Sequence, residues 1–189
     1  MSRVIANAYR HTAASADAIT LDSSGNVTFP ANATCSGTAT GFGGGKLLQV
    51  LSVIKTDLYS QSSAGSFTDI PNLNLTITPS ATSSKILAMA HLCHNVSNTS
   101  DYAYRLLRGS TALGNSTVGS EGTRVGIACG TNNANRSDPV ALFFLDSPNT
   151  TSATTYKIQV NHQNGSYRLN SRSGQWDGSS TLTIMEVGA

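Results

Sequence analysis

Strict alternation between apolar and polar residues runs through residues 72–78, where Leu or Ile occupies every second position and Asn or Thr lies between. A period of two is typical of a β-strand that packs one face on a core and turns the other to water. The pattern returns along most of the chain, and no long helical period interrupts it. We therefore expect an all-β fold.

The composition changes at residues 41–45, which are rich in glycine. Glycine resists long regular structure. This run predicts a hinge between an N-terminal segment, residues 1–45, and a C-terminal head, residues 46–189. The 189 residues are enough for one full domain with an appendage.

The clearest unit of the N-terminal segment is a hairpin, in which residues 18–21 and 27–30 flank the turn-forming residues 22–26. Its apolar side chains are Ile19, Leu21, Val27 and Phe29. A single hairpin is only marginally stable in water. We expect the N-terminal segment to be an extended anchor, of which residues 1–40 are ordered only through other subunits or an anchoring protein.

The head shows regularly spaced strand patterns with turn signals between them. The candidates are residues 46–55, 65–69, 72–78, 85–93, 102–108, 124–129, 140–145, 156–160, 166–170 and 181–187. Eight to ten short antiparallel strands predict a β-sandwich of the jelly-roll type. Residues 86–90 and 140–145 are apolar on both faces of the pleat, so we expect another subunit to cover the second face.

Several segments, in this order, resemble a known family. They are GKLLQV (45–50), FTDIP (67–71), LTITPS (75–80), SKIL (84–87), RLLRGST (105–111), FLDSP (144–148) and LTIMEV (182–187). Together they resemble the C-terminal domains of fibre and other virion structural proteins of tailed bacteriophages, and LDSSGNV (21–27) resembles the short repeats that precede such domains.

The resemblance implies a trimeric jelly roll like that of complement-component and tumour-necrosis-factor-like proteins. It further implies a homotrimeric tail fibre of the virion, assembled in the host cytoplasm. Residues 1–45 would attach to another virion protein, and the head would bind the host surface. The short segment before the head leaves an alternative open: a capsid decoration or cement protein, or a head fibre without a receptor.

The receptor-binding candidates lie in one stretch near the end of the chain. They are Trp176, Tyr167, Arg168, Gln175 and Asp177. An aromatic ring among amide and carboxyl groups suits contact with a host glycan, although a loop tryptophan also packs under its own turn or at a subunit boundary. The polar loops 97–101, 114–122 and 130–138 offer further surface.

The residues show no assembled catalytic motif, so we expect no enzyme activity. No Gly-x-Ser-x-Gly elbow occurs, and the 10 acidic residues form no close pair, which leaves a hydrolase as the weaker alternative. The run 91–94, His-Leu-Cys-His, is the most metal-like, yet alternation separates His94 from His91 and Cys93. We expect no metal and no cofactor. Scattered basic residues and the lack of a long apolar run predict neither nucleic-acid binding nor membrane insertion.

Overall fold

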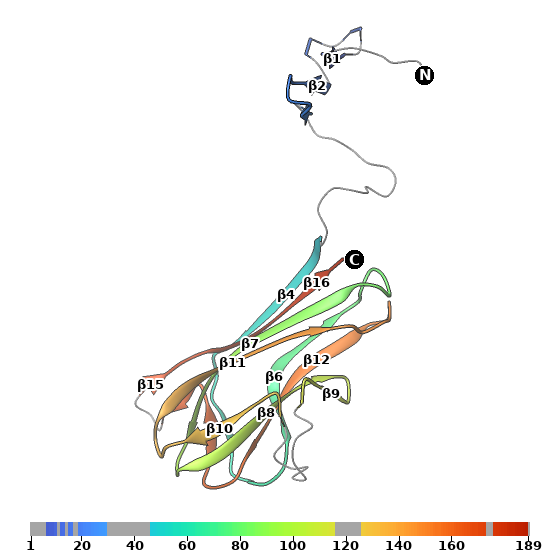
Figure 1. Cartoon of the computed structure of the whole chain (residues 1–189). Coiled ribbons are helices and arrows are strands. Elements are labelled where there is room, and N and C mark those ends of the chain that lie inside the picture. Colours follow the sequence, from blue (N-terminus) through green and yellow to red (C-terminus); the bar gives the residue numbers. More distant parts are fainter. Residues whose placement is uncertain are drawn as a thin grey trace. The chain divides into compact units, whose positions relative to one another are not determined.

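The computed structural model describes residues 7–10, 12–13, 15–16, 19–29, 46–115, 126–172 and 176–188. The chain divides into two compact units, Met1–Gly43 and Gly44–Ala189, which are described separately. The described residues contain no helix, and all of their strand pairs are antiparallel (Figure 1). The predicted all-β class is confirmed. The predicted glycine hinge at 41–45 lies outside the described residues.

The N-terminal unit contains a small sheet in the order β1 (Ala8–Tyr9), β2 (Ile19–Leu21) and β3 (Val27–Thr28). The predicted hairpin is confirmed, because β2 pairs with β3. Asp22 organises the turn: its Oδ1 accepts hydrogen bonds from the backbone N–H groups of Ser24 at 2.9 Å and Asn26 at 2.8 Å. Side chains of this kind stabilise turns by replacing backbone partners.

The larger unit is a sandwich of two sheets. The first sheet consists of β4 (Leu47–Lys55), β16 (Ser180–Val187), β7 (Lys85–Val96) and β11 (Ser137–Asp146), in that order, with β13 (Tyr167–Leu169) and β5 (Tyr59–Gln61) continuing it beside β7. The second consists of β6 (Thr68–Ile77), β12 (Thr154–His162), β8 (Ser100–Arg108) and β10 (Ala128–Asn132), with β9 (Thr111–Leu113) beside β8. This order is that of a jelly roll, so the predicted fold is confirmed.

Alternate residues of both sheets meet in one hydrophobic core. Its fully buried members include Leu73, Ile86, Leu92, Tyr104, Tyr156, Ile158, Tyr167, Leu169, Leu182 and Ile184. Each large apolar side chain contributes roughly 1.5–3 kcal/mol by leaving water. The core therefore supplies the main stabilisation of the sandwich and fixes which face of each strand points inward.

Two separate strands pair with one edge of β7, and between them the chain makes a short excursion out of the sheet. There β13 pairs with residues 94–96 and β16 with residues 85–91, and the small hairpin of β14 (Ser171–Arg172) and β15 (Trp176–Asp177) lies between them in sequence. Asn170, at φ 70°, turns the chain out of the sheet. This positive φ is costly for most residues, and Asn tolerates it better than most.

The two ends of the sandwich differ. The chain enters at Lys46, whose carbonyl accepts a hydrogen bond from the Gly188 N–H at 2.7 Å, and we call this end the base. The loops 97–99, 133–136 and 163–166 meet at the opposite, far end, where the Ser97 N–H donates to the Ser166 carbonyl at 3.0 Å. Figure 1 shows the start of β4 and the C-terminus at one end and β10 toward the other.

Several predicted strand limits were wrong. Residues 65–69 and 72–78 belong in part to a single strand, β6, because an irregularity around Asn72 (φ 63°) lets it bend without ending. Of the strand predicted at 124–129, residues 124–125 lie outside the described residues, and the strand found there is β10, Ala128–Asn132, which pairs with β8 despite its polar sequence. The alternation did not reveal β5, β9, β14 or β15, which are only two or three residues long.

Candidate functional site

The outer face of the first sheet carries many exposed apolar side chains, with polar Ser52, Thr183 and His91 among them. Its most exposed side chains, with their exposed fractions, are Leu47 57%, Val50 51%, Ile54 61%, Phe143 64% and Leu145 56%. We call this surface the outer apolar face. Large contiguous apolar patches on soluble proteins mark interaction sites far more often than chance allows.

Cross-strand register explains why these residues lie together. Val50 pairs with Met185, Met185 with Leu87, and Leu87 with Leu145, which makes one apolar row across all four strands. In the next row Ser52 pairs with Thr183, Thr183 with Met89 and Met89 with Phe143, so only its β7 and β11 positions are apolar. The strands predicted to be apolar on both faces, residues 86–90 and 140–145, are therefore β7 and β11 at the centre and edge of this surface.

The outer face of the second sheet is polar by contrast. Asp69 accepts hydrogen bonds from Lys157 Nζ and Gln159 Nε2, each at 2.7 Å, and the hydroxyls of Thr76 and Thr155 lie 2.7 Å apart. Such groups are well solvated and give no drive toward association. The two outer faces of the sandwich thus have opposite character.

Of the predicted receptor residues, the structure describes the side chains of Tyr167 and Arg168. Tyr167 has no exposed surface; its ring lies in the core, and its hydroxyl is 2.8 Å from that of Tyr104. The prediction that Tyr167 contacts a receptor is therefore wrong, because a buried ring cannot reach a ligand. The alternation of Tyr167, Arg168 and Leu169 contained this signal, since it places Tyr167 on the same face as the buried Leu169.

The other receptor candidates lie in or beside the β14–β15 excursion. Arg168 is half-buried, and its backbone pairs with Asn95 and Ser60. Trp176 and Asp177 form β15, with Trp176 opposite Arg172 and Asp177 opposite Ser171. Gln175 lies outside the described residues.

Asn170 and Ser180 form a buried hydrogen-bonded cluster where this hairpin leaves the first sheet. Asn170 Nδ2 donates to the carbonyls of Lys55 at 2.8 Å and Asp57 at 3.0 Å, and Ser180 Oγ donates to Asn170 Oδ1 at 2.6 Å. Ser180 Oγ also accepts the Cys93 N–H at 3.0 Å. Buried polar side chains with this many partners rigidify the backbone around them. The sequence pattern did not predict this hydrogen-bonded cluster.

The metal-like run 91–94 is split between two faces, as the alternation predicted. His91 is exposed on the outer face of the first sheet, whereas His94 is buried against Tyr102, with ring centroids 4.3 Å apart. Within the described ranges, no group of three His, Cys, Asp or Glu side chains comes close enough to hold a metal ion.

The buried carboxyl groups of the head have structural partners. Asp146 receives hydrogen bonds from Arg108 at 2.9 Å and from the Tyr156 hydroxyl at 2.6 Å, and burial, followed by this bond, raises the pKa of Tyr156. Burial also raises the pKa of Glu186, but bonds donated by Ser80 and Gln49 outweigh it, so its net pKa is lowered. Both groups tie loops to the sandwich.

Three of the predicted anchoring residues belong to the small N-terminal sheet, and the fourth, Phe29, follows β3 directly. Ile19 is half-buried, whereas Leu21, Val27 and Phe29 have 36%, 51% and 44% of their surface exposed. No helix among the described residues is long and apolar enough to cross a membrane. The fold and these surfaces together define the class of the protein: a jelly-roll sandwich with exposed apolar side chains on one outer face, and a small, partly apolar N-terminal unit.

No protein-family model matches this chain, and no curated protein matches it in sequence. Among solved structures, a chain from the infectious bursal disease virus Gx strain matches with 11% identity and a TM-score of 0.42 over 85% of this chain and 48% of that one. A chain from the T13 particle of the same virus matches with 15% identity and a TM-score of 0.42 over 74% and 37%.

A chain of the Bacillus endospore appendages, described as disulfide-linked pili, matches with 11% identity and a TM-score of 0.33 over 84% of this chain and 100% of that one. The protein thus spans less than half the length of the two viral chains. At this identity and overlap, none of these matches assigns a role to the chain.

Proposed function

We propose that this protein is a non-enzymatic structural component of a virus particle. In this proposal it forms a homotrimeric fibre of a tailed bacteriophage that attaches to the host surface. The observation that carries it is the outer apolar face, because exposed Phe143, Leu145, Val50 and Ile54 need a cover that the described residues of the head do not supply.

Identical chains are the simplest source of that cover. Cyclic assemblies bring the same surface of each subunit to a common axis, and a sheet face with a flat apolar row suits such packing. The polar outer face of the second sheet would then point to solvent. The number of subunits, three, follows from the resemblance to phage fibre domains.

The N-terminal unit supports attachment to another virion protein. Its strands are two or three residues long, and Leu21 and Val27 on them and Phe29 just after β3 remain exposed. A sheet of this size is marginally stable alone. Docking on a neighbouring virion protein, or on the same unit of other subunits, would bury these side chains.

The absence of enzyme activity remains part of the proposal. Its support is that Asp146 and Glu186, two acidic groups with buried hydrogen-bond networks, bond to Arg108, Tyr156 and Ser80 within the fold. Such networks are structural, since their lone pairs are occupied by the protein itself.

Sedimentation of the purified chain tests the assembly. We expect a species of three times the chain mass of 19.6 kDa at micromolar concentration. Phe143→Asp should dissociate it, because a carboxylate would be buried without a partner. The matched control, Asn74→Asp, adds the same charge to the exposed outer face of the second sheet and should leave the trimer intact.

Ile54→Glu, on the opposite edge of the outer apolar face, is a second test in case Phe143→Asp misfolds. Circular dichroism checks that both variants are folded. A folded wild-type monomer would contradict the proposed assembly. For the attachment role, purified protein should block adsorption of the phage to its host. If it instead binds capsids, raises their thermal tolerance and leaves adsorption unchanged, the protein is a capsid decoration protein.

A further inference from the structure

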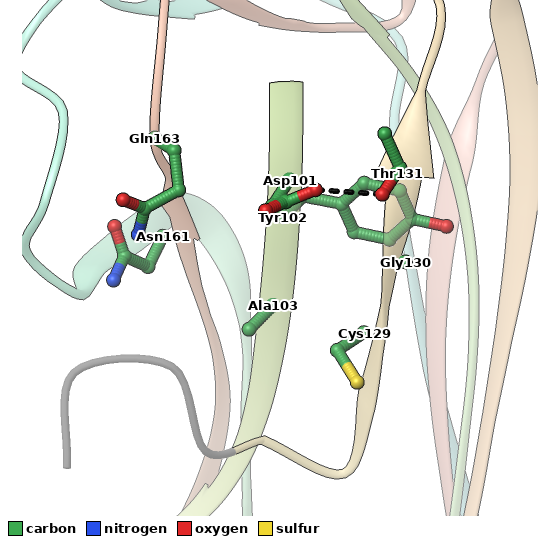
Figure 2. A pocket seen from close by; sticks show the side chains of 8 residues that line it. All are labelled: Asp101, Tyr102, Ala103, Cys129, Gly130, Thr131, Asn161 and Gln163. Carbon is green, nitrogen blue, oxygen red and sulfur yellow. Dashed lines mark hydrogen bonds between the residues drawn. The ribbon is translucent and has the colours of Figure 1, made fainter. Parts of the chain in front are cut away.

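A pocket of about 270 Å³ opens on the second sheet near the far end of the sandwich. It is lined by Asp101, Tyr102 and Ala103 of β8, by Cys129, Gly130 and Thr131 of β10, and by Asn161 and Gln163 at the end of β12. Figure 2 shows Asn161 and Gln163 on one side of β8, with Cys129 and Thr131 on the other.

Strand register creates this pocket. Ala103 pairs with Cys129 on one side and with Asn161 on the other, so the smallest side chain stands in the middle of a three-strand row. In the next row, Asp101 pairs with Thr131, and its carbonyl accepts the Gln163 N–H at 3.0 Å. A small residue between larger neighbours leaves a depression with polar groups at its rim.

Asp101 is the charged group of the pocket. Its Oδ1 accepts a hydrogen bond from Thr131 Oγ1 at 2.6 Å, and its Oδ2 accepts none from the part of the chain that the structure describes. Asp101 and Thr131 are both exposed, so the carboxylate is oriented by the bond and open to a ligand. An oriented carboxylate is a strong acceptor for hydroxyl groups.

The lining selects among ligand classes. None of the described residues that line the pocket is Lys or Arg, and Asp101 repels anions, so an anionic ligand is disfavoured. A purely apolar ligand would cover the Asp101 carboxylate without hydrogen-bonding it, which is costly. A neutral ligand rich in hydroxyls can donate hydrogen bonds to the Asp101 carboxylate while its C–H surface packs against exposed Cys129.

We propose that this pocket binds one neutral sugar unit of a surface glycan. The volume is slightly below the usual range of about 300–1,000 Å³ for small-molecule sites, which suits a single ring. The pocket lies away from the base, where the N-terminal segment joins the head. This inference rests on the attachment role proposed above and gives that role a site.

Cys129 provides the assay, because its thiol is exposed and lines the pocket. The purified full chain is alkylated with iodoacetamide, with and without tens of millimolar glucose, galactose, mannose, N-acetylglucosamine or N-acetylgalactosamine. Mass spectrometry follows the modification of each cysteine. At least one sugar should slow alkylation of Cys129 several-fold, while Cys93, outside the pocket, reacts at an unchanged rate.

Two matched comparisons sharpen the test. Asp101→Asn should weaken protection by about tenfold, the expected loss of a charge-assisted hydrogen bond. Asp69→Asn makes the same change on the same sheet outside the pocket and should leave protection unchanged. Glucuronate should protect less than glucose, because its carboxylate meets Asp101.

The inference is overturned if no sugar slows alkylation of Cys129. It is also overturned if the sugar slows this alkylation equally in the Asp101→Asn and Asp69→Asn variants. It is also overturned if phenol protects Cys129 and the sugars do not. The attachment role stands or falls separately: wild-type protein that blocks phage adsorption, with an Asp101→Asn variant that blocks it equally well, keeps the role and removes the pocket from it.

Discussion

Acid should destabilise the head through His94, a histidine that is buried in the core. His94 has 1% of its surface exposed, and its ring packs against Tyr102 at 4.3 Å and Tyr167 at 6.0 Å between centroids. Neither ring nitrogen has a hydrogen-bond partner among the described residues. A proton on this ring would place a positive charge in the core without a hydrogen-bond acceptor.

Burial lowers the pKa of His94 from its ordinary 6.5 to about 4, although the nearby Asp138 acts in the opposite direction. The unfolded chain therefore takes up the proton more readily than the folded one. Stability from this group is fully present above the unfolded pKa and is lost as the pH falls toward the folded pKa.

The magnitude follows from the two pKa values. Each pH unit between them costs about 1.4 kcal/mol, so roughly 2 kcal/mol is lost by about pH 5 and roughly 3 kcal/mol by about pH 4. A loss of this size is a large fraction of the 5–15 kcal/mol or so that stabilises a typical domain.

Urea unfolding, followed by circular dichroism near neutral pH and at about pH 5, measures the effect at one fixed protein concentration. His94→Phe keeps an aromatic ring in the core but cannot take up a proton. We expect the variant to lose about 2 kcal/mol less than the wild type between the two pH values.

Leu169→Ala is the matched control. Buried Leu169 pairs with His94 in the strand register, and its substitution removes no titrating group. It should cost about 2–5 kcal/mol at both pH values and keep the wild-type pH dependence. If His94→Phe retains the whole pH dependence of the wild type, the folded core accepts the proton at His94 and the reasoning is refuted.

Two further perturbations test the buried polar contacts. Asn170→Ala removes the hydrogen bonds to the carbonyls of Lys55 and Asp57 and strains a backbone at φ 70°, so the free energy of unfolding in urea should fall by about 2–4 kcal/mol. Asn170→Gly accepts that φ and should lose less stability. Equal losses in the two variants would disprove the strain. Tyr104→Phe and Tyr167→Phe each leave one buried hydroxyl without its partner and should each cost about 1–2 kcal/mol; the double variant should cost clearly less than their sum, and strict additivity would show that the two hydroxyls do not interact.

Alternation predicted most of the long strands of the head, because a half-buried strand repeats every two residues whatever its neighbours are. The turn-forming residues 22–26 predicted the hairpin turn, in which Asp22 accepts the local hydrogen bonds. The two-sided apolar runs in β7 and β11 correctly indicated apolar side chains on both faces. These features depend on residues close in sequence, and so the sequence contains them.

Tyr167 and β10 show where this reasoning stops. An aromatic residue near polar neighbours was assigned to a surface, yet pairing with β7 and β5 turns its ring into the core beside Tyr104. The polar strand β10 exists because β8 offers it a ladder of hydrogen-bonding partners. Short or polar strands form through such pairing, which no local pattern records.

The amino-acid sequence alone determined the strand-rich class, the local turns and the presence of surplus apolar surface. The tertiary structure decided that this surface gathers on one sheet and that the pocket forms around Ala103 between Cys129 and Asn161. Register is the physical reason: a shift of one residue turns every side chain of a strand to the opposite face, and register is set by partners distant in the chain.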